Sequence, residues 1–145
     1  EIRVTNALLK SVDGKSKRTL GCPCGDTRVR DSSYLHAVSN EFVAFRDGRP
    51  DAVTLNRFGD YVIQWSGPSG TTGEEMIAQV KKAMQDNALL IFVFHGVGGE
   101  HNLNVSEEAH EQLLQFLQQN IGDIWLAPFI EVAEYMQRDG GQKKQ

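Results

Sequence analysis

The sequence has no long hydrophobic run. Its longest apolar stretch, Ala88 to Phe94, is far shorter than the about 20 residues that a membrane-spanning helix needs. A charged and then apolar leader is also missing from the first residues, so we expect no signal peptide within this stretch of chain. We therefore expect a globular domain without a membrane span.

Basic clusters and cysteines are scarce too. The chain carries 15 Lys and Arg against 19 Asp and Glu, and outside the carboxy-terminal "QKKQ" its basic residues are scattered. This distribution disfavours a nucleic-acid partner, because neutralising phosphates needs clustered cations. Cys22 and Cys24 are separated by one residue, and so short a disulfide would be strained. We expect free thiols, which do not identify a redox compartment.

The sequence does contain an alternation of extended and helical patterns. Stretches rich in β-branched and aromatic residues, bounded by Gly and Pro, predict strands over residues 19–22, 43–46, 61–65, 88–94 and 123–129. Amphipathic stretches predict helices that begin near residues 2, 73, 107 and 130, the first of which ends near Gly14. Short connections between them indicate an α/β fold with parallel strands, in one domain over residues 1–138 with a flexible tail over 139–145.

Two helix starts carry capping residues. Thr72 and Glu75 form the spacing of a capping box, and Ser106 precedes two glutamates as an N-cap does. The expected apolar stripes are Ile77, Val80 and Met84 on the first helix, and His110, Leu113, Leu114 and Leu117 on the second. Between these helices, residues 88–94 lack alternation, which predicts a strand buried on both faces.

His95 directly follows that strand, and Gly96, Gly98 and Gly99 come next. Chemistry in parallel sheets collects at the carboxyl ends of strands, and a histidine there can serve as general acid or base near neutral pH. Glycines let the backbone pass close to a ligand. The alternative is that His95 is satisfied by a backbone carbonyl and that the glycines only form a turn.

Three stretches resemble one family. "FVFHGVGGEH" followed by "VSEEAHEQLLQFLQQNIGDIWLAPFIEVAEYM" resembles the carboxy-terminal part of polysaccharide deacetylases, the NodB-homology or family-four carbohydrate esterases. "LGCPCGDTRV" resembles the Pro-x-Gly turn of that family's third motif, so the resemblance runs from about Arg18 to Met136. It implies the carboxy-terminal part of a distorted β/α barrel, and metal-dependent removal of acetyl groups from sugars.

The resemblance also implies roles for individual residues. His95 matches the histidine that protonates the leaving amine or alkoxide. Cys24 takes the place whose backbone N–H stabilises the oxyanion, and a backbone donor survives the change from the usual aromatic side chain. The implied substrate groove includes Pro23, Gly25 and Val93 (against the acetyl methyl). Trp65 and Trp125 belong to predicted strand ends, where aromatic faces could stack on sugar rings. Both tryptophans also suit an ordinary core.

The sequence departs from the family in three places. Gly21 stands where the third motif normally has an arginine, no Asp-Asp pair occurs, and none of the four histidines are spaced by one helical turn. The divalent metal that the resemblance implies, zinc by expectation, therefore has no ligands in this chain. We expect a missing amino-terminal segment, or a second copy of the chain, to complete the enzyme. Its substrate would be an acetylated polysaccharide or oligosaccharide in an extracytoplasmic compartment.

Other interpretations stay open. The whole domain could be a catalytically inactive carbohydrate-binding or structural module. Glu100 and His101 could join His95 in a metal site, although a solvated loop rim is the simpler interpretation. Arg46 and Asp60 could orient a catalytic partner or pair at the surface.

Overall fold

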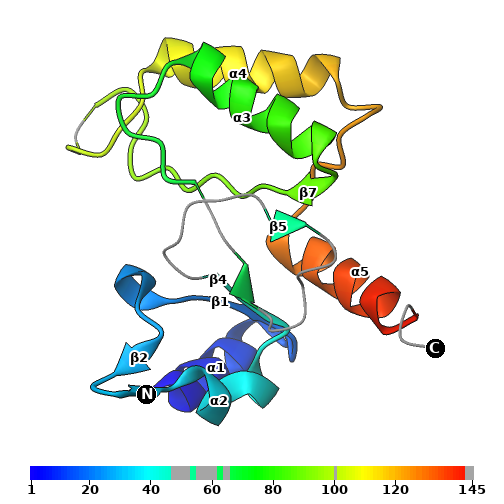
Figure 1. Cartoon of the computed structure of the whole chain (residues 1–145). Helices are drawn as coiled ribbons and strands as arrows, with labels where there is room; N and C mark the ends of the chain where they lie inside the picture. Colours follow the sequence, from blue (N-terminus) through cyan, green and yellow to red (C-terminus); the bar gives the residue numbers. More distant parts are fainter. Residues whose placement is uncertain (47–52, 55–61, 64–65, 100, 143–145) are drawn as a thin grey trace. The chain divides into compact units, whose positions relative to one another are not determined.

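A computed structural model describes residues 1–46, 53–54, 62–63, 66–99 and 101–142 (Figure 1). The chain divides into two compact units. The first comprises Glu1–Gly48, Phe58–Ile63 and Pro128–Gln145, and the second comprises Arg49–Arg57 and Gln64–Ala127. The single domain over 1–138 with a flexible tail stays a prediction.

The first unit contains a parallel sheet of three short strands. These are β1 (Thr19–Gly21), β4 (Ala44–Arg46) and β6 (Val62–Ile63), in the order β1-β4-β6. All three fall within predicted strands, and both pairings are parallel, as predicted. The α/β class is therefore confirmed, whereas the described residues show a small sheet and no barrel.

Helices and a hairpin complete this unit. Its elements are α1 (Ile2–Asp13), η1 (Pro23–Gly25), β2 (Arg28–Val29), β3 (Ser32–Ser33), α2 (Leu35–Val38), η2 (Ser39–Glu41) and α5 (Phe129–Gln142). The core gathers around buried Cys22, Val38 and Phe45. Polar contacts help to attach α5: the Lys17 Nζ lies 2.6 Å from the Glu134 carboxylate, and the Gln137 amide donates to the Val43 carbonyl oxygen at 2.7 Å.

Helix α1 ends as its sequence predicts. Gly14 adopts a left-handed conformation with φ of 70°, and its N–H donates to the carbonyl oxygen of Lys10. Glycine reaches this conformation without the steric cost that a Cβ would add. No residue of α1 is buried, and the apolar side chains of Val4, Leu8 and Val12, one turn apart, are exposed.

The second unit is built on two helices that lie side by side, α3 (Gly73–Gln85) and α4 (Glu107–Gln119) (Figure 1). Their shared core is Met76, Val80, Val105, Ala109 and Leu113. Both predicted caps are present. The Thr72 hydroxyl accepts from Glu75 N–H while the Glu75 carboxylate accepts from Thr72 N–H, and the Ser106 hydroxyl accepts from Ala109 N–H.

The predicted parallel strand over 88–94 is wrong in extent and in pairing. Only β7 (Ala88–Leu89) is a strand, and it pairs antiparallel with β5 (Val53–Thr54). Beyond β7, a single parallel bridge joins Phe92 to Ser66. Residues 88–94 are half-buried, because the helices cover only one side of the segment.

The strand predicted over 123–129 is also wrong. Residues 124–128 have no regular structure, and α5 begins at Phe129. The described residues provide no neighbouring strand with which this segment forms a ladder, so its apolar composition alone does not make it a strand. Within the described part of the chain, no helix has the length and hydrophobicity to span a membrane.

Candidate functional site

His95 lies at the end of an extended segment whose side chains alternate between two sides. Leu90, Phe92 and Phe94 pack against the core of α3 and α4. Because successive side chains of extended backbone point in opposite directions, Val93 lies on the other side from Phe92 and Phe94. The chain bends at His95, which is exposed, whereas Val93 is half-buried.

The loop after His95 is fastened at its base. Val105 N–H donates to the Gly96 carbonyl oxygen at 3.2 Å, and Gly98 N–H donates to the Val105 carbonyl oxygen at 2.9 Å. Val105 itself is only 1% exposed, within the helical core. The loop is therefore better anchored than its three glycines suggest.

Position 98 requires glycine for two reasons. Its φ is +80°, and a Cβ there would stand 2.6 Å from a carboxylate oxygen of Glu107. A side chain would be strained by the backbone and would also displace Glu107 from the start of α4.

Two histidines meet in this loop. The rings of His95 and His101 lie 5.5 Å apart between centroids, with an interplanar angle of 19°. The Nδ1 of His101 accepts the Leu103 N–H at 3.0 Å. Glu100, the further ligand of the suggested loop metal site, lies outside the described residues. Among the residues that are described, no three His, Cys, Asp or Glu side chains gather as a metal site.

The turn that resembles the third motif belongs to the first unit. Strand β1 ends at Gly21, and the turn η1 follows, with Gly25 N–H donating to the Cys22 carbonyl oxygen at 2.9 Å. Cys24 is exposed and adopts φ of 54° and ψ of 17°. Its N–H donates no hydrogen bond to any described residue. The oxyanion role of Cys24 stays a prediction.

Buried groups hold this turn in place. Cys22 is buried, and its N–H donates to the Arg46 carbonyl oxygen at 2.8 Å. The Tyr34 hydroxyl donates to the Asp26 carbonyl oxygen at 2.7 Å. Burial, with a smaller contribution from the neighbouring Cys22 thiol, raises the pKa of Tyr34 to about 12, so its hydroxyl remains a donor well above neutral pH.

The side chain of Arg46 covers Gly21. These two residues are register partners on β1 and β4, and a Cβ at position 21 would lie 2.8 Å from the Arg46 Nη2. A guanidinium therefore lies beside Gly21, the position at which the resembling family's third motif has an arginine. Sequence spacing could not identify this pair, because the two residues are brought together only by strand pairing.

The remaining candidates are distributed as follows. Trp125 is 55% exposed, so its ring is not part of the core. His110 packs edge-on against Phe94 with 4.9 Å between ring centroids, in agreement with a core role. Trp65 and Asp60 lie outside the described residues.

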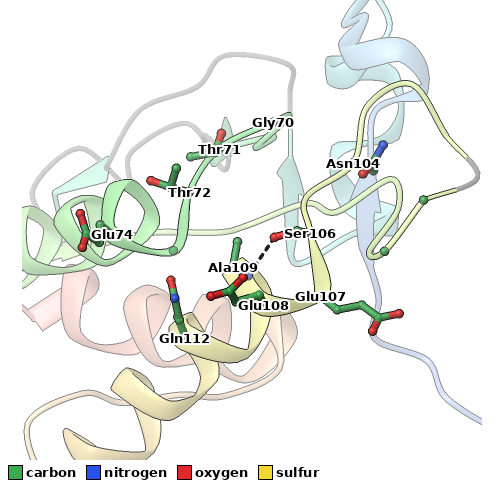
Figure 2. Close-up of a pocket in the computed structure, with 13 residues that line it drawn as sticks. Gly70, Thr71, Thr72, Glu74, Asn104, Ser106, Glu107, Glu108, Ala109 and Gln112 are labelled. Atoms are coloured by element: carbon green, nitrogen blue, oxygen red, sulfur yellow. Dashed lines mark hydrogen bonds between the residues drawn. The ribbon is translucent and has the colours of Figure 1, made fainter.

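A polar cavity that the sequence did not predict lies in the second unit (Figure 2). It has a volume of about 870 Å³ and is lined by residues before and within the first turns of α3 and α4, and by the loop after His95. Its ionic and amide side chains are those of Glu74, Glu107, Glu108, Asn104 and Gln112. The capping residues predicted where the two helices start. They did not predict that both starts line one cavity.

The predicted site residues thus fall into two sets. Val93, His95 and Trp125 belong to the second unit, whereas Pro23, Cys24 and Gly25 belong to the first. Comparisons with models of protein families, with curated proteins and with solved structures found no match to this chain.

Proposed function

We propose that this chain is the carboxy-terminal part of a metal-dependent carbohydrate deacetylase, which releases acetate from an N- or O-acetylated saccharide. The observation that carries the proposal is the placement of His95. It is exposed, it follows a segment whose Phe92 and Phe94 pack against the core, and a loop anchored to the core comes after it. In the first unit, Cys24 is exposed and its N–H bonds no described residue, which supports the oxyanion role that the resemblance implies.

In the proposed reaction, water adds to the acetyl carbonyl and the resulting tetrahedral species collapses to acetate. His95 gives its proton to the leaving nitrogen or oxygen as the bond to the acetyl carbon breaks. The Cys24 N–H donates a hydrogen bond to the oxyanion. The proton lost by the attacking water goes to a base outside this chain, because the sequence lacks the Asp-Asp pair of the resembling family.

The divalent metal, expected to be zinc, does not fit the residues of this chain. The described residues hold no group of three potential ligands, and the sequence lacks the paired histidines. We propose that the metal and the base come from an amino-terminal segment or from a second copy of the chain. The exposed apolar residues of α1 are consistent with such a partner. A stable monomer of the pure chain, with no co-purifying fragment, would contradict this part of the proposal.

The second candidate is an inactive carbohydrate-binding or structural module. The exposed Trp125 favours it, because an aromatic face can stack on a sugar ring without any catalysis. The full reading frame distinguishes the two candidate functions. An Asp-Asp motif and a histidine pair upstream of this chain would support the deacetylase, and their absence would support the inactive module.

The decisive experiment replaces His95 in the completed enzyme. General acid catalysis contributes about 10²–10⁴-fold, so His95→Ala should lower kcat on the acetylated sugar by about that factor with little change in KM. An aryl acetate, whose leaving group departs without a proton, should be affected far less. The control is His36→Ala, which removes an exposed histidine of α2 in the first unit.

Equal losses on both substrates, together with a lower Tm, would show that His95 only supports the loop. A second test uses the 145-residue chain alone, which should release no acetate even with added metal and should bind Zn²⁺ only weakly. Acetate release by the pure chain at the rate of a complete enzyme would contradict the proposal that the metal and the base come from outside this chain.

A further inference from the structure

We propose that His101 is the positioning residue for His95: it presents a fixed ring face that holds the His95 imidazole in one orientation. The catalytic consequence rests on the proposed function of His95, whereas the orientation itself does not.

The two rings are close and nearly parallel. Their centroids are 5.5 Å apart and their planes differ by 19°. Both residues are exposed, and His95 donates or accepts no hydrogen bond among the described residues. The ring of His101 is therefore the aromatic contact that restrains the otherwise exposed imidazole of His95.

His101 is itself held from several directions. Its Nδ1 accepts the Leu103 N–H at 3.0 Å, and the Asn104 amide donates to its carbonyl oxygen. A Cβ at Gly96 would lie 3.3 Å from the His101 Cβ, so the backbone of Gly96 and the side chain of His101 are already in close approach. The Leu103 N–H restrains the His101 ring directly, and the contacts of Asn104 and Gly96 restrain its backbone and Cβ.

The hydrogen bond to Nδ1 also fixes the tautomer of His101. A neutral imidazole carries one proton, and a nitrogen that accepts an N–H cannot carry it. The proton of neutral His101 is therefore on Nε2. That nitrogen acts as a hydrogen-bond donor.

Two substitutions separate the ring face from the loop contacts. His101→Asn keeps an acceptor for the Leu103 N–H and removes the aromatic face, whereas His101→Phe keeps the face and removes the acceptor. We expect ¹³C relaxation of the His95 ring to show greater motion in the Asn variant and near wild-type order in the Phe variant. In the wild-type chain, ¹⁵N shifts should report a protonated Nε2 on neutral His101.

Unchanged motion of the His95 ring in His101→Asn, or a protonated Nδ1 on neutral His101, would overturn the inference. In the completed enzyme, His101→Asn should lower kcat by up to about 10²-fold with little effect on KM, since small misplacements of a catalytic group cost that much. His101→Phe should recover most of this loss, and equal losses in the two variants would contradict positioning through the ring face.

The outcomes also separate this inference from the proposed function. If the ring of His95 loses order in His101→Asn but His95→Ala affects sugar and aryl acetate alike, the deacetylase assignment of His95 fails and the orientation by His101 stands. If the His95 ring is equally ordered in all variants, the positioning role fails whatever the activity.

Discussion

The guanidinium of Arg46 occupies the space that a side chain at position 21 would need, with Nη2 at 2.8 Å from where a Cβ of Gly21 would lie. The pair is set by the parallel register of β1 and β4. The obstructing atom is the far end of a flexible side chain, so a methyl group at position 21 can displace it without moving the backbone.

Gly21→Ala should therefore leave the fold nearly intact while it moves the guanidinium of Arg46. We expect a change in Tm of no more than about 5 °C, which corresponds to about 1 kcal/mol for a small unit. In the completed enzyme kcat should fall, as it should in Arg46→Ala, if the guanidinium acts at the site. Full activity in both variants would assign Arg46 a structural role only.

Tyr34→Phe should change the response of the protein to alkali. The ordinary pKa of tyrosine is 10.0 and the pKa of folded Tyr34 is about 12, so between these values the unfolded chain has lost a proton that the folded chain keeps. The stabilisation is complete below pH 10 and is lost as the pH rises toward 12. Denaturant titrations from pH 9 to 12 should show this decline in the wild type and a weaker decline in the variant. Parallel curves would contradict the raised pKa.

The caps of α3 and α4 should each contribute measurably to stability. Thr72→Ala and Ser106→Ala remove hydroxyls that accept N–H groups of Glu75 and Ala109, and each should cost about 1 kcal/mol in denaturant unfolding. Thr71→Ala is the matched control, because the one hydrogen bond that its hydroxyl makes within the described residues is to the Ser69 carbonyl oxygen at 3.5 Å. If Thr71→Ala lowers the free energy of unfolding as much as the cap variants do, capping is not the cause of the loss.

Leu113 and Leu114 provide a second matched pair. Leu113 is 2% exposed in the core of the second unit, and its neighbour Leu114 is 50% exposed. Leu113→Ala should destabilise by about 2–5 kcal/mol, the cost of lost burial and a residual cavity. Leu114→Ala should remain within about 0.5 kcal/mol of the wild type. Comparable losses from the two substitutions would mean that α4 presents a different face to its core.

Local signals in the sequence predicted the helices well. The capping box at Thr72, the N-cap at Ser106 and the glycine after α1 each specify a helix end through bonds within a few residues. The prediction of which helix face is buried was less accurate. In α3, Met76 is fully buried, whereas Met84, which was placed on the apolar stripe, is exposed. A helix of this length has apolar residues on more than one face, and only its neighbour decides which are covered.

The strands and the site could be predicted only in part, because they depend on distant partners. The apolar run 88–94 has the composition of a buried strand, but its ladder depends on which segment lies beside it. The contact between Gly21 and Arg46 likewise follows from register. The stack of His95 and His101 joins residues six apart through a loop whose shape depends on pairing at Val105.

The same pairing makes the loop beside His95 a poor candidate for an independently opening lid. Both backbone bonds at its base involve Val105, whose side chain lies in the helical core. Opening the loop has to break two backbone hydrogen bonds to a residue that the core holds in place. The amides of Gly98 and Val105 should therefore exchange more slowly than loop amides without such bonds, and the Val105 amide should exchange faster in Leu113→Ala, which loosens the core around it. Substrate would then enter beside an already assembled His95, without waiting for a local opening step.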